Sequence, residues 1–133
     1  MSAEKHFISA ESLLKDSFAL AMAVLGSGYR PSFIVGVWRG GAPVGVVVQE
    51  ALQHHGLDAD HVAIRASSYY GIDRKHALIK TYALDYIVDT VNADDALLIV
   101  DDVFDTGNTI AAVMGELRAK ARGNAPRDIR VAV

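Results

Sequence analysis

The sequence has 133 residues, which is enough for one domain with its own hydrophobic core. Hydrophobic residues make up 51% of it and charged residues 22%, which excludes a disordered, highly charged tail. The lack of cysteine excludes disulfides, thiolate chemistry and zinc–sulfur sites. A net charge of −3 argues against a general nucleic-acid-binding face, and no apolar run approaches the roughly 18 residues that span a bilayer. We therefore expect a cytoplasmic enzyme or binding domain that has no nucleic-acid or membrane partner.

Helical and extended patterns alternate along the chain. Residues 10–25 carry apolar side chains at helical spacing, and the glycines that follow end this helix. Its apolar stripe consists of Leu13, Leu14, Phe18, Ala21, Met22 and Leu25. The further expected elements, in chain order, are a strand at 33–37, a helix at 40–55, a strand at 61–67, a short helix at 82–91, a strand at 96–100, a helix at 108–121 and a strand at 129–133. Residues 68–80 are polar and basic, and they show no clear period.

Strands separated by helices predict an α/β fold, with a mostly parallel central sheet and helices flanking it. We expect residues 1–133 to form a single domain of this kind. In such sheets ligands bind beyond the carboxyl ends of the strands. The glycine-containing turns at 39–41 and 105–107 both follow strands. The sequence therefore predicts that these two turns lie on the same rim of the sheet.

The segment 97–109 carries the polar groups best suited to chemistry. Asp101 and Asp102 directly follow four apolar strand residues. The start of the next helix then brings together Asp105, Thr106, Gly107, Asn108 and Thr109. Unpaired N–H groups and the positive end of the helix dipole form an anion site at such a start. An ordinary helix cap explains Asp105 or Thr106 equally well, but it does not explain the acidic pair at the end of an apolar strand.

Two further segments suit an anionic ligand. Trp38-Arg39-Gly40-Gly41 follows the strand at 33–37 and forms either a phosphate-binding turn or a tight turn with a surface arginine. Ser68 and Tyr69 precede a basic stretch that forms either a ligand-binding loop or a solvated one. That stretch contains Arg74, Lys75, His76 and Lys80.

Residues 97–109 resemble the phosphoribosyl-diphosphate signature of the type I phosphoribosyltransferases, a motif of about 13 positions. The resemblance implies that Asp101 and Asp102 hold the ribose hydroxyls, either directly or through Mg²⁺. It assigns the 5′-phosphate to a loop made of Asp105, Thr106, Gly107, Asn108 and Thr109. In the purine-salvage members of the family, the acidic residue at the position of Asp105 is the general base that accepts the proton of the purine.

Residues 35–41 are similar to the diphosphate loop of the same family. The resemblance implies a cis peptide bond between Trp38 and Arg39, and it implies that Arg39 and Gly40 bind the diphosphate. Residues 64–69 are similar to the start of the family's mobile loop, in which a Ser-Tyr pair, here Ser68 and Tyr69, closes over the reacting diphosphate. We therefore expect residues 68–80 to be mobile until a ligand binds.

The resemblance implies an enzyme that transfers the 5-phosphoribosyl group from phosphoribosyl diphosphate to a nucleobase. It is greatest for the purine salvage enzymes that use hypoxanthine, guanine or xanthine. Mg²⁺ is the implied cofactor, and a homo-oligomer is the implied assembly. The family's base-recognition residues would follow the strand at 129–133, so we expect the chain to lack that segment.

Two other classes remain open at this point. A regulatory protein of the same fold could bind phosphoribosyl diphosphate as a signal without transferring it. A receiver-type signalling domain also places an acidic pair after an apolar strand. Receivers, however, carry that pair after their first strand, whereas here it lies at 101–102.

Overall fold

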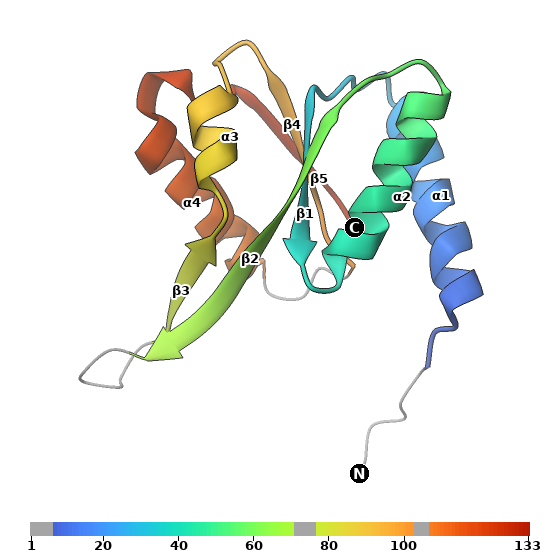
Figure 1. Ribbon diagram of the computed structural model, residues 1–133, viewed down its shortest axis with the longest axis horizontal. Coiled ribbons are helices and arrows are strands. Elements are labelled where there is room, and N and C mark those ends of the chain that lie inside the picture. The colour runs from blue at the N-terminus through green and yellow to red at the C-terminus, as the bar shows by residue number, and fades with distance from the viewer. Residues whose placement is uncertain (1–6, 71–76, 103–106) are drawn as a thin grey trace.

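A computed structural model describes residues 7–70, 77–102 and 107–133 (Figure 1). In chain order its elements are α1 (Ala10–Gly26), β1 (Phe33–Trp38), α2 (Gly41–His54), β2 (Asp60–Tyr70), β3 (Ala77–Tyr82), α3 (Asp85–Thr90), β4 (Ala96–Val100), α4 (Asn108–Ala121), a 3₁₀ turn (Arg122–Asn124) and β5 (Asp128–Ala132). The five strands form one sheet in the order β3-β2-β1-β4-β5. β2, β1, β4 and β5 are parallel, and β3 pairs antiparallel with β2. The predicted α/β fold with a mostly parallel sheet is confirmed.

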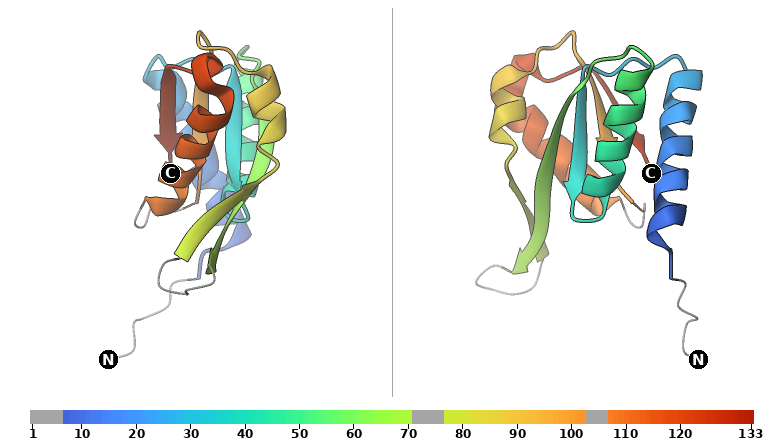
Figure 2. Two further views of the ribbon diagram at one scale, coloured as in Figure 1. Left: turned by 90° about the vertical axis from the view of Figure 1, so that its left-hand side faces the viewer. Right: turned by 45° about the vertical axis from the view of Figure 1, so that its right-hand side comes forward.

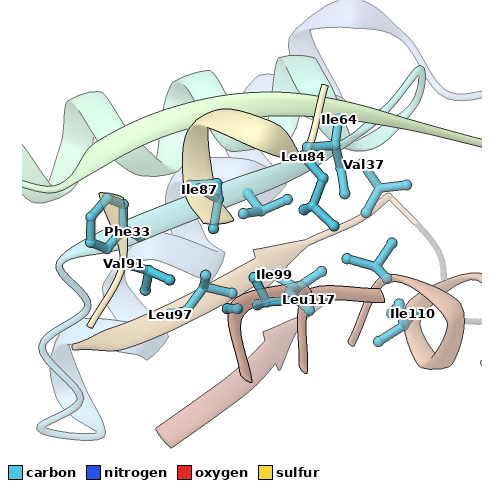
Figure 3. Packing of buried hydrophobic residues seen from close by; sticks show 13 residues of the cluster. Phe33, Val37, Ile64, Leu84, Ile87, Val91, Leu97, Ile99, Ile110 and Leu117 are labelled. Atoms are coloured by element: carbon cyan, nitrogen blue, oxygen red, sulfur yellow. The ribbon is translucent and has the colours of Figure 1, made fainter. Parts of the chain in front are cut away.

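Helices cover both faces of the sheet. Figures 1 and 2 show α1 and α2 on one side and α3 and α4 on the other. Alternation along β1 explains this arrangement, because successive side chains point to opposite faces. Phe33, Val35 and Val37 pack with residues of α3 and α4, in the cluster that Figure 3 shows. Ile34 packs instead with residues of α1 and α2. Because β1 is buried on both faces, its sequence is a continuous apolar run and does not alternate between apolar and polar residues.

The predicted apolar stripe of helix α1 is confirmed only in part, because Ala21 is buried and Leu13, Met22 and Leu25 pack against the core. Ser17, Ala21 and Val24 are its buried residues. Leu14 and Phe18, which belong to the predicted stripe, are 56% and 48% exposed. Small side chains at spacings of four and three residues let α1 lie close to α2, and the Ser17 hydroxyl is satisfied by donating to the Leu13 carbonyl oxygen at 2.7 Å.

The expectation that residues 68–80 lack regular structure is wrong. Strand β2 runs on to Tyr70, and β3 returns beside it from Ala77, with Ser68 opposite Ile79. The sequence at 77–82 favours a strand, but the basic residues just before it obscure that signal. Residues 71–76 lie outside the described residues, so the expected mobility of this segment stays a prediction.

The remaining predicted elements match closely. The strand at 96–100 and the helix at 108–121 have the predicted bounds, whereas α3 covers only the middle of the predicted segment 82–91. None of the helices within the described ranges combines the length and the apolar character needed to cross a bilayer.

Tyr29 connects the segment before β1 to the starts of β4 and β5. Its hydroxyl lies 2.9 Å from the carbonyl oxygen of Leu97 and 3.0 Å from that of Asp128. The Arg130 guanidinium lies 4.3 Å from the centre of the Tyr29 ring. Burial, with the nearby charge of Asp128, raises the pKa of Tyr29 to about 12. Tyr29 therefore stays a neutral hydrogen-bond donor between β4 and β5.

His61 lies on β2 beneath α2. Its Nε2 atom is buried and has no hydrogen-bond partner among the described residues. A Cβ atom added at Gly45 would come within 2.7 Å of this nitrogen, and one added at Gly36 within 3.1 Å. The two glycines therefore make room for the imidazole between β1 and α2. Burial lowers the pKa of His61, and the neighbouring Asp60 charge opposes this only in part.

We predict that this histidine makes folding sensitive to acid. Its folded-state pKa lies below 6.5, so the unfolded chain binds a proton more readily than the folded chain does. The free energy of unfolding should therefore fall as the pH drops below about 6.5. Urea denaturation between pH 5 and pH 7.5 should show a smaller loss for His61→Gln than for the wild type. An equal loss in both would contradict the prediction, and His55→Gln, which removes an exposed imidazole, is the control.

Candidate functional site

The site forms where β1 and β4 end side by side. These parallel strands are neighbours, with Gly36 opposite Val100. The loop that leads from β1 into α2 therefore reaches the same rim as the residues that follow β4. Figure 1 shows this rim at the bottom of the view, where β1 ends beside the start of α2. The predicted meeting of the 39–41 turn with the segment after β4 is confirmed for the described residues.

Gly40 and Gly41 pack directly against the acidic pair. A Cβ atom added at Gly40 would overlap the Asp102 carboxylate. One added at Gly41 would come within 2.5 Å of the Val100 carbonyl oxygen and 2.8 Å of the Asp101 Cα atom. The Gly40 backbone is in the ordinary helical region, at φ −61° and ψ −36°. Space, rather than backbone conformation, is therefore what requires glycine at position 40.

Asp101 and Asp102 are in direct contact. The Asp102 N–H donates to Asp101 Oδ1 at 2.8 Å. Burial raises the pKa of Asp101 to about 6, and the Asp102 side chain acts in the same direction. Holding two negative charges this close is unfavourable unless a proton or a cation lies between them.

The pair has the chemistry of a magnesium ligand set. Mg²⁺ prefers oxygen ligands and is commonly held by one or two carboxylates together with substrate phosphates. Asp101 and Asp102 supply such oxygens, and burial raises the pKa of the Asp101 carboxyl. Within the described ranges, no group of three or more acidic or histidine side chains could hold a metal ion. The pair therefore fits an ion that takes its remaining ligands from substrate or water.

Helix α4 opens with a glycine in the left-handed region. Gly107 is the N-cap residue at φ 80°, a conformation that favours glycine. Its carbonyl oxygen accepts the first helical bond, from the Ala111 N–H at 2.9 Å. Because Gly107 has no side chain, the helix start carries no side-chain cap. Asp105 and Thr106, the alternative cap residues, lie outside the described part of the chain, so their interpretation as helix caps stays a prediction.

The other predicted site residues lie on the rim, in the first turn of α4 and further out along β2. The predicted cis peptide bond is present between Trp38 and Arg39, and Arg39 is exposed on the rim. Asn108 and Thr109 form the first turn of α4. Ser68 and Tyr69 lie further out, because β2 continues beyond its last pairing with β1.

Two cavities adjoin this rim, and sequence reasoning missed residues in both. One, of about 450 Å³, lies beside Asp101 and Asp102 and is also lined by α1 residues such as Asp16. The other, of about 420 Å³, is lined by Trp38, Arg39, Arg65 and Ala66. Strand register places Arg65 there, and this register is not visible in the sequence.

The sequence matches a known family over nearly its whole length. Residues 9–133 match the model of the phosphoribosyl transferase domain. The chain belongs to this family. It is a phosphoribosyl transferase, as the resemblance implied. A comparison with curated proteins found no match.

Solved structures agree with the phosphoribosyl transferase fold. A purine phosphoribosyltransferase from Pyrococcus horikoshii Ot3 is 24% identical, with a TM-score of 0.68, over 95% of this chain and 74% of that one. A xanthine-guanine-hypoxanthine phosphoribosyltransferase from Helicobacter pylori is 25% identical, with a TM-score of 0.62, over 94% of this chain and 73% of that one. A hypothetical protein from Neisseria gonorrhoeae, solved with bound ppGpp, is 16% identical, with a TM-score of 0.77, over 98% of this chain and 70% of that one.

We predict different consequences for an added methyl group at the two loop glycines. At Gly41 it meets backbone atoms that cannot move independently, so Gly41→Ala should lower the free energy of unfolding by about 1–3 kcal/mol. At Gly40 it meets the end of the Asp102 side chain, which can rotate away, so Gly40→Ala should cost less than about 1 kcal/mol.

Urea denaturation measures both changes. Gly115→Ala is the matched control, because Gly115 lies within α4 and an added Cβ meets nothing within 4 Å. This control should raise stability by roughly 0.4–1 kcal/mol. Equal losses at Gly40 and Gly41 would show that the Asp102 side chain is held as firmly as the backbone.

Proposed function

We propose that this phosphoribosyl transferase uses phosphoribosyl diphosphate and a purine base, with Mg²⁺, to form a nucleoside monophosphate and diphosphate. The observation that carries the proposal is the direct packing of Gly40 and Gly41 against Asp101 and Asp102. This contact joins a loop suited to phosphoryl oxygens with a pair suited to a cation and to ribose hydroxyls.

Each part of the rim has a role in the proposal. Asp101 and Asp102 hold the ribose hydroxyls and supply oxygen ligands to Mg²⁺, which when bound would neutralise the leaving diphosphate. Arg39 and the Gly40 backbone bind that diphosphate. The start of α4, at Gly107, Asn108 and Thr109, binds the 5′-phosphate together with Asp105 and Thr106 of the loop before it.

The chemical step is a substitution at the anomeric carbon. A base nitrogen forms a bond to that carbon, and the bond from the carbon to the diphosphate oxygen breaks. The diphosphate leaves with the electron pair, and the Asp105 carboxylate accepts the proton of the base. The sugar gains positive charge during this step, and nearby carboxylates stabilise that charge.

A purine is the base that the comparisons favour. The Pyrococcus horikoshii protein is named for purines, and the Helicobacter pylori protein for xanthine, guanine and hypoxanthine. Both cover most of this chain. A cytoplasmic location and a homo-oligomeric state stay predictions from the sequence.

Turnover tests the proposal directly. The full-length protein is incubated with Mg²⁺, phosphoribosyl diphosphate and each of hypoxanthine, guanine and xanthine, and the nucleoside monophosphate and diphosphate are quantified. Formation of both products in equal amounts from at least one base is the expected result. Magnesium-dependent binding of phosphoribosyl diphosphate without product from any of these bases would overturn the purine-transferase proposal.

That second outcome describes the alternative function, a regulatory protein that binds phosphoribosyl diphosphate without transferring its sugar. The Neisseria gonorrhoeae structure favours keeping this alternative, because a similar fold there holds ppGpp, another phosphorylated ribose compound.

We predict that the acidic pair is required for binding. Asp101→Asn combined with Asp102→Asn removes the charges that favour a cation, so the affinity for magnesium-bound phosphoribosyl diphosphate should fall at least about ten-fold. Calorimetry measures the affinity, and thermal unfolding checks that the variant is folded. Unchanged affinity in a folded variant would remove the pair from the site.

We predict a different effect at Asp105. Asp105→Asn removes the proton acceptor but keeps the shape of the side chain, so turnover should fall by roughly 10²–10⁴. The affinity for phosphoribosyl diphosphate should change much less. Steady-state kinetics and calorimetry on one preparation separate the two effects, and normal turnover would exclude Asp105 as the base.

A further inference from the structure

A pocket with two arginines lies on the same rim as the acidic pair. Its volume is about 420 Å³, and Trp38, Arg39, Arg65 and Ala66 line it. Sequence reasoning and the family resemblance assigned a role to Arg39 alone. Arg65 is the second guanidinium, and no step proposed above uses it.

Strand pairing brings the two arginines together. β1 and β2 are parallel, and Arg65 is the partner of Trp38, the last residue of β1. Arg39 follows Trp38 at the start of the loop into α2. Both arginines are exposed. The two arginines therefore line one pocket from separate segments of the chain.

The charges on the rim are divided into two neighbouring regions. None of the four described residues that line the arginine pocket has a carboxylate. One residue further along, Gly40 packs against the Asp102 carboxylate. A cation-binding pair and an anion-binding pocket are thus separated by a single step of the backbone. A metal-bound diphosphate matches this layout, because its metal and its phosphoryl oxygens carry opposite charges.

We propose that Arg65 is a second diphosphate-binding residue, which acts with Arg39 on the diphosphate group of the substrate. The inference rests on the proposed function, because it names a further residue of the same site. A diphosphate has two phosphoryl groups, and each guanidinium can bind oxygens of one of them in a fork geometry. Arg65 then favours phosphoribosyl diphosphate over ribose 5-phosphate, which has no phosphate at the anomeric carbon.

The chain provides its own probe for the test. Trp38 is the only tryptophan in the sequence, and it is a 52% exposed part of the pocket wall. Tryptophan fluorescence should therefore report ligands that enter this pocket. The full-length protein is titrated, in the presence of Mg²⁺, with inorganic diphosphate, phosphoribosyl diphosphate and ribose 5-phosphate. Calorimetry supplies the affinity of any ligand that leaves the fluorescence unchanged.

Arg65→Gln should weaken the binding of inorganic diphosphate and phosphoribosyl diphosphate by about 10-fold or more, as expected for the loss of charge-assisted hydrogen bonds. The affinity for ribose 5-phosphate should stay within about two-fold of the wild type. Arg65→Lys keeps the charge but loses the fork, so its affinity for both diphosphates should lie between those of the wild type and Arg65→Gln.

Arg127→Gln is the matched control. Arg127 lies just before β5 begins, on the opposite rim, and its ion pair with Asp94 is long and exposed, at 3.9 Å. It makes the same change in net charge away from the pocket, so all three affinities should stay close to those of the wild type. Thermal unfolding confirms that each variant is folded.

The outcomes separate the inference from the proposed function. If the wild type turns over a base but Arg65→Gln binds all three ligands normally, or loses all three equally, the inference about Arg65 is overturned and the proposed function stands. If the wild type binds inorganic diphosphate through Arg65 but gives no product, the anion site stands and the proposed function fails. If the wild type binds none of the ligands, both are overturned.

Discussion

The close approach of two backbone segments determines the geometry of this rim. The loop after β1 comes this close to the residues after β4 because position 41 is a glycine, whereas at position 40 the Asp102 side chain can rotate to make room. Any side chain at 41 would meet the Val100 carbonyl oxygen and the backbone of Asp101, and any side chain at 40 would meet the Asp102 carboxylate. This contact fixes the distance between the loop at Gly40 and Gly41 and the acidic pair. The proposed function depends on it, because a metal-bound diphosphate would have to reach both.

Glycines also allow close packing where α2 lies on the sheet. Gly36 on β1 and Gly45 on α2 leave room for the His61 ring, so the helix lies close to the strands. Helix α2 begins at Gly41, the residue that touches the end of β4. The packing of α2 against the sheet therefore also affects the position of the loop that precedes it. The His61 ring fills the space between β1 and α2, its buried Nε2 atom has no hydrogen-bond partner among the described residues, and burial lowers its pKa.

The fold was largely predictable because its signals are local. Apolar runs and helical spacing in the sequence predicted β1, β4, α2 and α4, since strands buried on both faces and helices with one buried side leave such patterns. The predictions failed at two elements, α1 and β3, for physical reasons. Helix α1 buries small residues such as Ser17 because it must fit against α2, which hydrophobicity alone does not reveal. Strand β3 is stabilised by pairing with β2, and its short strand-forming sequence was obscured by the basic residues just before it.

The sequence by itself determined the family, the α/β class and the identity of the acidic pair, because a run of strand, carboxylates, glycine and helix start is contiguous in the chain. Only the tertiary structure decided what lies across from that pair. Gly40 meets Asp102 because β1 and β4 are neighbours, and Arg65 joins Arg39 because β2 pairs with β1 in a particular register. Both contacts join residues far apart in the chain. Register and strand order arise from packing over the whole sheet, so no local pattern encodes them.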